Sequence, residues 1–150
     1  MYTRFVHYNG GMKQPKDCPF CSPLEHVVKE NEIAKAILSD PHKVPGHVLV
    51  MPKRHVEAPW DLQPDELQAI FELISFIEQR FIGKLGDGMD IRQSYRPFLP
   101  QDKLKLNHLT FHILPRSMDD YLHAVSGQYE DGLYAELDDL EAKAVNELLK

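Results

Sequence analysis

The sequence predicts an α+β fold whose sheet is mainly antiparallel. Segments with strand-like and helix-like patterns alternate irregularly along the chain. The gaps between successive strands are too short for repeated βαβ crossovers, which a parallel sheet would need. One long amphipathic segment begins near Pro64 and supplies a helix to cover such a sheet. The 150 residues are enough for one compact domain with its own core.

The composition limits the classes of partner. Apolar residues make up 43% of the chain and charged residues 27%, as in ordinary soluble globular proteins. The net charge of −6 argues against a surface for polymeric nucleic acid or for membranes, where Lys and Arg are in excess. No apolar run is long enough to cross a bilayer, and the first residues lack a signal-peptide core. We therefore expect a cytoplasmic protein without a membrane partner.

The first half of the chain is expected to hold an arm and two strands. Residues 1–17 contain glycine and proline breakers and predict an irregular arm. Residues 32–38 read as a strand, and residues 40–46 as a turn-rich loop. Residues 47–51 form a short, nearly continuous apolar strand that Pro52 ends.

The second half is expected to hold two helices and two strands. The helix that begins at Pro64 has acidic residues in its first turn and glycines after its last apolar position. Residues 90–95 and 106–114 read as strands. Leucines at helical spacing over residues 133–148 predict an amphipathic helix in a C-terminal extension, residues 117–150. Residues 1–150 are thus expected to form a single domain.

The only two cysteines, Cys18 and Cys21, lie three positions apart. In a reducing compartment such a pair is a metal half-site or a redox pair. A redox pair is expected at a helix N-terminus in a βαβ context, which the sequence does not predict here. Zinc needs four ligands, and His55, just beyond one predicted strand, and His108, at the start of another, could complete a Cys2His2 site. Two thiols without a metal are the alternative.

The predicted strand over residues 106–114 places alternate side chains on one face. This puts His108, Thr110 and His112 together, while three apolar residues face the other way toward a core. Two imidazoles with a hydroxyl between them would make the floor of a site. The alternative is a set of polar residues on a solvent-exposed face.

Residues 18–116, about two thirds of the chain, resemble the histidine triad (HIT) superfamily of nucleotide hydrolases and nucleotidyl transferases. The resemblance implies a HIT-like fold with a mainly antiparallel sheet of about five strands flanked by helices, often paired as a homodimer. It also implies a nucleoside phosphate site over the triad strand. The resemblance rests on the helix after Pro64 and on three motifs: Cys18-Pro-Phe-Cys21, Pro45-Gly-His-Val-Leu-Val-Met-Pro-Lys-Arg-His55 and His108-Leu-Thr-Phe-His112-Ile-Leu-Pro-Arg116.

The resemblance also implies a structural zinc ion. In zinc-containing members, the two hook cysteines, the histidine after Pro-Lys-x and the first triad histidine bind the metal. These positions are Cys18, Cys21, His55 and His108 in this sequence, the same set that ligand chemistry favours.

The ligand pocket implied by the resemblance includes a histidine that lies by the phosphate, and His47 matches it. An acidic residue in the preceding loop usually meets the ribose hydroxyls, and Asp40 or its neighbour Ser39 occupies that place. The Gln and Ser/Thr that usually bind phosphate before the triad are missing. Arg92 is a candidate to meet the phosphate by charge instead.

The chain departs from the family at Thr110, where the central triad histidine would attack the α-phosphorus. A Thr hydroxyl has a far higher pKa than an imidazole and needs a base to become a nucleophile. Catalysis would therefore depend on His112 and His47, which could handle protons while water attacks directly, with Thr110 in the nucleophile's place.

Three functions are consistent with these residues. The first is a HIT-like hydrolase or nucleotidyl transferase acting on nucleoside phosphates of the dinucleoside polyphosphate or phosphoramidate class. The second is a catalytically silent nucleotide-sensing or regulatory module that keeps the fold and the zinc. The third is a zinc-stabilised interaction domain without a nucleotide site. Loss of a nucleophile commonly reduces the rate by several orders of magnitude, so Thr110 and the missing Gln and Ser/Thr favour the second function. The retained His47 and His112 favour residual function of the pocket, so the first function is the main prediction and the second is the alternative.

Overall fold

The computed structural model describes residues 18–102, 104–127 and 134–150. The chain separates into two compact units, Met1–Ser117 and Met118–Lys150, which are described here one at a time. The predicted arm over residues 1–17 lies outside the described residues. The boundary after Ser117 coincides with the start of the predicted C-terminal extension.

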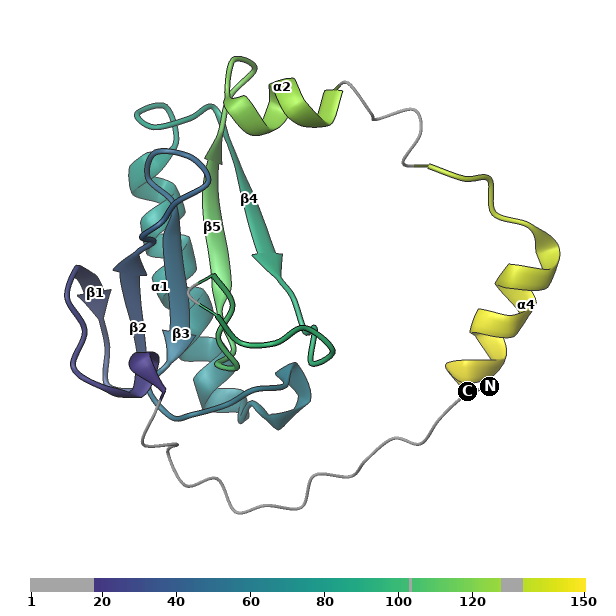
Figure 1. Ribbon diagram of the computed structural model, residues 1–150, viewed down its shortest axis with the longest axis horizontal. Helices are drawn as coiled ribbons and strands as arrows, with labels where there is room; N and C mark the ends of the chain where they lie inside the picture. Colours follow the sequence, from purple (N-terminus) through teal and green to yellow (C-terminus); the bar gives the residue numbers. More distant parts are fainter. Residues whose placement is uncertain (1–17, 103, 128–133) are drawn as a thin grey trace. The chain divides into compact units, whose positions relative to one another are not determined.

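The first unit is built on a five-stranded sheet in which every neighbouring pair is antiparallel (Figure 1). The strand order is β1-β2-β3-β5-β4, so β1 and β4 are the edges. This confirms the predicted α+β fold with an antiparallel sheet. The strands are β1 (Val27–Glu30), β2 (Ala34–Leu38), β3 (Val48–Pro52), β4 (Gly88–Gln93) and β5 (Phe111–Arg116).

Helix α1 (Pro64–Phe81) covers one face of this sheet (Figure 1). Its N-terminus has a capping box, in which the Glu66 side chain accepts from the Gln63 N–H. Its apolar stripe packs on the inward residues of β2, β3 and β5, as the helical spacing predicts. The core between helix and sheet consists of Ala34, Ala36, Val48, Val50, Ala69, Ile70, Leu73, Ile74, Ile77 and Ile113.

The other face of the sheet carries a smaller apolar cluster of Ile37, Leu49 and Met51, against which Phe20 and Leu24 pack. Phe20 belongs to a short 3₁₀ turn, η1 (Pro19–Cys21), which brings the cysteine hook onto this face. Because side chains alternate along a strand, the residues of β4 and β5 that point away from α1 share this face. It is therefore the face on which the candidate site residues lie.

The largest differences from the predicted strands concern β5 and β1, while β4 lies two residues earlier than the predicted strand over residues 90–95. The last strand does not begin at residue 106 but at Phe111, and it continues through Pro115 to Arg116. Before it, the Leu109 N–H donates to the Val56 carbonyl at 2.6 Å, which ties this segment to the loop after β3 instead of to a strand ladder. Strand β1 was not predicted, because all four of its residues are exposed and show no apolar alternation.

The second unit contains α2 (Tyr121–Gly127) and α4 (Asp139–Leu148). Helix α4 confirms a C-terminal amphipathic helix, which begins later than expected because Asp138 caps it by accepting from the Glu141 N–H at 2.8 Å. Helix α2 was not predicted. No helix among the described residues combines the length and the apolar character needed to span a membrane.

Ile113→Ala should destabilise the first unit by about 2–4 kcal/mol, because Ile113 is fully buried between the sheet and α1. Urea unfolding followed by circular dichroism would measure the change. Ile91 is the cross-strand partner of Ile113 but is 43% exposed, so Ile91→Ala is the matched control with a much smaller effect. Equal losses for both variants would contradict the assigned core.

Candidate functional site

Four metal-binding side chains, which come from three separate segments, meet at one place. Cys18 precedes the η1 turn and Cys21 is its last residue, His55 lies in the loop after β3, and His108 lies shortly before β5. One ligand atom from each lies within 4.8 Å of all the others. The sequence grouped the same four residues.

The distances in this cluster suit tetrahedral zinc. The Cys18 Sγ to His108 Nδ1 distance is 3.5 Å, Cys21 Sγ to His55 Nδ1 is 3.4 Å, and Cys21 Sγ to His108 Nδ1 is 3.7 Å. Bonds of about 2.3 Å to sulfur and about 2.0 Å to nitrogen at tetrahedral angles give S···N separations of about 3.5 Å. The four residues could thus bind a metal ion with little movement.

The imidazoles of His55 and His108 are each oriented by a partner at the ring nitrogen Nε2, on the side away from the cysteines. The Nε2–H of His108 donates to the Pro52 carbonyl at 2.9 Å, and His55 Nε2 lies 3.2 Å from a carboxylate oxygen of Glu57. These partners leave the Nδ1 lone pairs facing the thiols, which is the arrangement that metal-binding histidines usually have.

Burial sets the protonation states in the absence of a metal. It lowers the pKa of His108 from 6.5 to about 4, so that imidazole is neutral at pH 7. Burial, helped by a hydrogen bond with Cys18, raises the pKa of the Cys21 thiol to about 11. A metal would therefore displace a proton from Cys21 as it binds.

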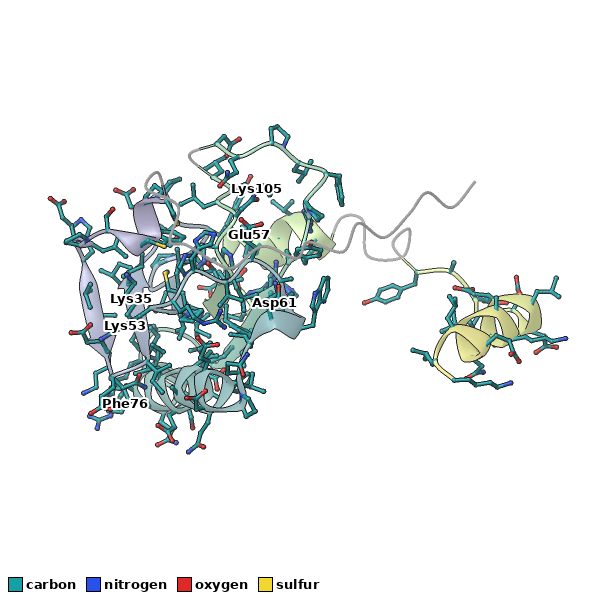
Figure 2. All side chains as sticks on the ribbon, turned by 90° about the horizontal axis from the view of Figure 1, so that it is seen from below. Lys35, Lys53, Glu57, Asp61, Phe76 and Lys105 are labelled. Carbon is teal, nitrogen blue, oxygen red and sulfur yellow. The ribbon has the colours of Figure 1, made fainter. Side chains whose placement is uncertain are left out.

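One lysine and one arginine side chain hold in place the segments that carry these metal-binding residues. Lys35, on β2, is almost fully buried and donates from Nζ to the Phe20 carbonyl within the hook at 2.6 Å (Figure 2). Arg54, next to His55, donates from Nε and Nη2 to both carboxylate oxygens of Glu66, each at 2.7 Å. This fork anchors the loop after β3 to the first turn of α1. Neither tertiary contact was predicted from the sequence.

A second centre is formed by His47 and His112. His47 Nε2 lies 2.9 Å from His112 Nδ1, and His47 Nδ1 accepts from the Lys43 N–H at 3.2 Å. Because Nδ1 of His47 is an acceptor, its Nε2 must carry the proton and donate to His112. In neutral His112 the remaining proton is then on Nε2, which is a hydrogen-bond donor available to a ligand.

The turn before β3 positions His47. Gly46 has φ +79°, a conformation that favours glycine, and a Cβ there would come within 2.8 Å of the Leu85 side chain. The His47 carbonyl accepts from the Ser39 N–H at 2.9 Å, which ties the other end of the loop to the same residue. The Pro-Gly-His sequence thus places the imidazole.

Burial lowers the pKa of both His47 and His112 to about 4. The charge of His112 lowers the pKa of His47 further, and the charges of Lys43 and Arg92 lower the pKa values of both rings. Arg92 is directly opposite His112 in the β4–β5 register. Arg92 was a sequence candidate, whereas Lys43 was missed, although its position four residues before His47 was a usable signal.

The remaining sequence candidates for the site are Thr110, Ser39 and Asp40. Thr110 precedes β5, and its Oγ1 donates to the His108 carbonyl at 2.8 Å. Because the strand starts at Phe111, the expected alternation of side chains does not extend back to His108. The His108 ring instead lies against Cys18 and Cys21. Ser39 donates from its hydroxyl to the Pro41 carbonyl, and Asp40 is exposed in the same loop.

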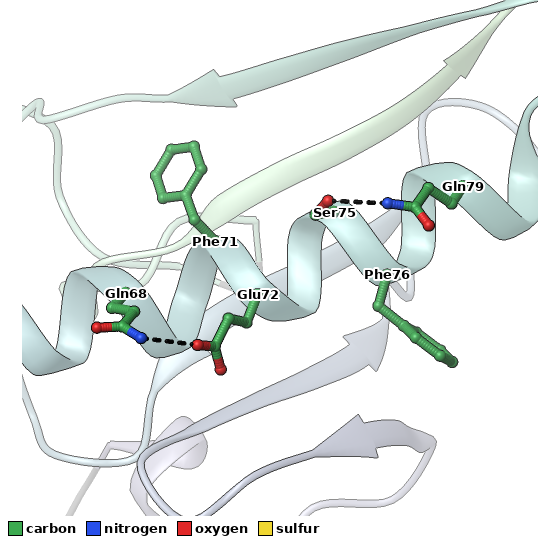
Figure 3. A pocket seen from close by; sticks show the side chains of 6 residues that line it. All are labelled: Gln68, Phe71, Glu72, Ser75, Phe76 and Gln79. Carbon is green, nitrogen blue, oxygen red and sulfur yellow. Dashed lines mark hydrogen bonds between the residues drawn. The ribbon is translucent and has the colours of Figure 1, made fainter.

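A shallow hollow on the solvent side of α1 has a different character (Figure 3). Its polar groups pair with one another, Gln68 with Glu72 and Gln79 with Ser75. It lies on the helix that covers the opposite face of the sheet from His112, so it takes no part in the histidine centre. Its lining consists of Gln68, Phe71, Glu72, Ser75, Phe76 and Gln79.

The sequence model of the HIT domain family matches residues 24–119 of this chain. An uncharacterized HIT-like protein of Methanocaldococcus jannaschii is 34% identical over an alignment of 114 residues, which covers 69% of this chain and 81% of that protein.

Two solved structures share the fold. A hypothetical histidine triad nucleotide-binding protein of Sulfolobus tokodaii is 28% identical, with a TM-score of 0.57 over 69% of this chain and 71% of that one. A Zn-bound histidine triad family protein of Mycobacterium smegmatis is 21% identical, with a TM-score of 0.59 over 77% of this chain and 97% of that one.

Both imidazoles of the His47–His112 pair should stay neutral from pH 8 down to about pH 5, because their pKa values lie near 4. Since the unfolded chain takes up protons nearer the ordinary 6.5, this contribution to stability is present above about pH 6.5 and is lost as the pH falls through about 4. Long-range ¹H–¹⁵N NMR would check the charge and the Nε2–H tautomers. Midpoints near 6.5 for both rings would contradict the assigned burial and hydrogen bonds.

Proposed function

Because the chain belongs to the HIT domain family, we propose that it binds a nucleoside phosphate at the His47–His112 pair and hydrolyses a phosphoanhydride or phosphoramidate bond in it. The observation that carries this proposal is the hydrogen-bonded imidazole pair, buried at His47 and half-buried at His112, whose bonds leave the Nε2–H of His112 as a donor on the strand opposite Arg92. The Sulfolobus tokodaii neighbour is described as nucleotide-binding, which supports the ligand class.

In the proposed reaction, water supplies the nucleophile. Its oxygen forms a bond to phosphorus while the bond to the leaving oxygen or nitrogen breaks, and the Nε2–H of neutral His112 donates a hydrogen bond that stabilises the negative charge developing on the phosphate or the leaving group. Solvent takes the proton lost by the water and supplies one proton to the leaving group. His47 holds His112 in the required tautomer. Thr110, which donates to the His108 carbonyl, can still accept a hydrogen bond from the attacking water.

The cations and the loop before β3 would bind the rest of the ligand. Lys43 and Arg92, whose charges act on both imidazoles, would neutralise phosphate. Asp40 or Ser39 would meet the ribose hydroxyls, since their loop ends at His47. A nucleotidyl transferase would use the same groups with another acceptor in place of water.

A second candidate function is nucleotide sensing or regulation without turnover. The hydrogen bond from Thr110 Oγ1 to its own chain's carbonyl favours it, because the hydroxyl proton is directed to the His108 carbonyl and not to a base. The fold, the imidazole pair and the cations would then serve binding alone.

We also propose that Cys18, Cys21, His55 and His108 hold a structural zinc ion. The support is the donor set, the tetrahedral distances and the two oriented imidazoles. The Mycobacterium smegmatis neighbour is described as Zn-bound. With all four positions filled by protein ligands, the ion would fasten the hook to the segments after β3 and before β5, and would do no chemistry on the nucleotide. The homodimer and the cytoplasmic location stay predictions.

Incubation with dinucleoside polyphosphates and adenosine phosphoramidate should give slow turnover, detected by chromatography of the products. His112→Ala should lower kcat about 10²–10³-fold, since it removes the hydrogen-bond donor that stabilises the developing negative charge. Thr110→His should raise the rate by restoring a nucleophile. His26→Ala is the control, because His26 is an exposed histidine of the first unit that belongs to neither centre. Micromolar binding without turnover supports sensing instead, and turnover that survives His112→Ala contradicts the site.

Native mass spectrometry should find one zinc ion per chain in protein never exposed to chelator. Cys18→Ser should lose it, because sulfur supplies half of the ligands. His26→Ala replaces a histidine outside the cluster and should keep the metal. A metal-free native chain would refute the zinc proposal and leave the phosphate proposal standing.

A further inference from the structure

An ion triad lies beside the histidine pair, on the strands β4 and β5. Asp90 Oδ2 accepts from Arg92 Nη2 at 2.6 Å and Nε at 3.2 Å, and from Arg116 Nη1 at 2.6 Å. One carboxylate oxygen therefore holds two guanidinium groups. The carboxylate of Asp90 is about one third exposed, and Arg92 is the most exposed of the three side chains.

The register fixes where this triad lies relative to the proposed ligand. Arg92 is paired with His112 and Asp90 with Leu114, so their side chains share the face that points away from α1. Arg116 is on the same face, four residues after His112. Since β4 is an edge of the sheet, no further strand among the described residues of the first unit covers Arg92 on its outer side.

We propose that Asp90 is a positioning residue that strengthens phosphate binding by holding Arg92 at the histidine centre. This rests on the proposed function of the site. The bonds to Nε and Nη2 engage one edge of the Arg92 guanidinium and leave the Nη1 edge for a ligand. Without Asp90, this long and partly exposed side chain would have to be ordered by the phosphate itself, which weakens binding.

The shared carboxylate explains how an acid can aid anion binding. Asp90 faces two positive charges, so the triad keeps a net charge of +1 at neutral pH. Burial alone would raise the pKa of Asp90, but the hydrogen bonds from Arg92 and Arg116 outweigh it and hold this pKa below its usual range. The carboxylate is therefore ionised wherever a nucleoside phosphate would be bound.

The effect of Asp90→Asn on phosphate affinity distinguishes a positioning role of Asp90 from a simple effect of its charge. Asp90→Asn removes a negative charge near the site, so Coulomb attraction alone would tighten phosphate binding. If Asp90 acts by holding Arg92, the same change weakens it. Asp87 supplies the matched control, because it is an exposed acid three residues away and no bond from it to Arg92 is present among the described residues.

Isothermal titration calorimetry with AMP and with pyrophosphate measures this sign. We expect roughly fivefold to tenfold weaker binding for Asp90→Asn and less than twofold change for Asp87→Asn. On an Arg92→Gln background, Asp90→Asn should have almost no further effect, because the two residues act as one unit. Tighter binding by Asp90→Asn, or an undiminished loss on the Arg92→Gln background, overturns the proposal.

A ligand-free measurement separates this proposal from the proposed function. In ¹H–¹⁵N spectra, the Arg92 Nε–H should exchange slowly with water in the native protein and in Asp87→Asn, and rapidly in Asp90→Asn. Rapid exchange in the native protein overturns the role of Asp90 even if AMP binds. Absence of AMP and pyrophosphate binding overturns the phosphate site itself, and the role of Asp90 with it. Urea unfolding of each variant shows that the comparison is made on folded chains.

Discussion

The pairing of β3 with β5 is the constraint on which both candidate centres depend. Val48 faces Ile113 and Leu49 faces His112, so the core residue and the site residue are set by one register. A slip of one residue would send His112 into the core under α1 and Ile113 to the outside. At the end of β3, the Pro52 carbonyl then receives the His108 ring. The same pair of strands therefore orients one histidine of each centre.

The two centres use one residue type for different chemistry by changing what lies behind the ring. At the cluster, the Pro52 carbonyl and the Glu57 carboxylate engage Nε2 of His108 and His55, so Nδ1 lone pairs face two sulfur atoms. At the His47–His112 pair, the chain of donors begins at a backbone N–H and ends with a proton on the outer ring nitrogen. The first arrangement suits a cation and the second suits an anion.

Local patterns predicted the sheet, α1 and the four cluster residues, because apolar spacing and ligand type are properties of short segments. The predicted start of the last strand was wrong. The Leu109 N–H bonds to the Val56 carbonyl, and a local pattern does not reveal such a long-range hydrogen bond. The exposed β1 carried no apolar alternation to read. The position of Lys43 before His47 was readable, but the bond from its backbone N–H to His47 Nδ1 required the structure. The bonds of Asp90 to Arg92 on its own strand and to Arg116 on the neighbouring strand also required it. The pair of His47 and His112 was expected, while its tautomers required the geometry.

The separation of Cys18 from His108, which are 90 positions apart and whose side chains lie 3.5 Å from one another, has a consequence for biosynthesis. A metal ion at the cluster closes almost the whole first unit into one loop. At synthesis rates of about 5–20 residues per second, the hook would leave the ribosome roughly 5–20 seconds before its last partner. During that interval the thiols are exposed to oxidants and to competing metals, so the supply of reducing equivalents bears on how much correctly metallated protein a cell obtains.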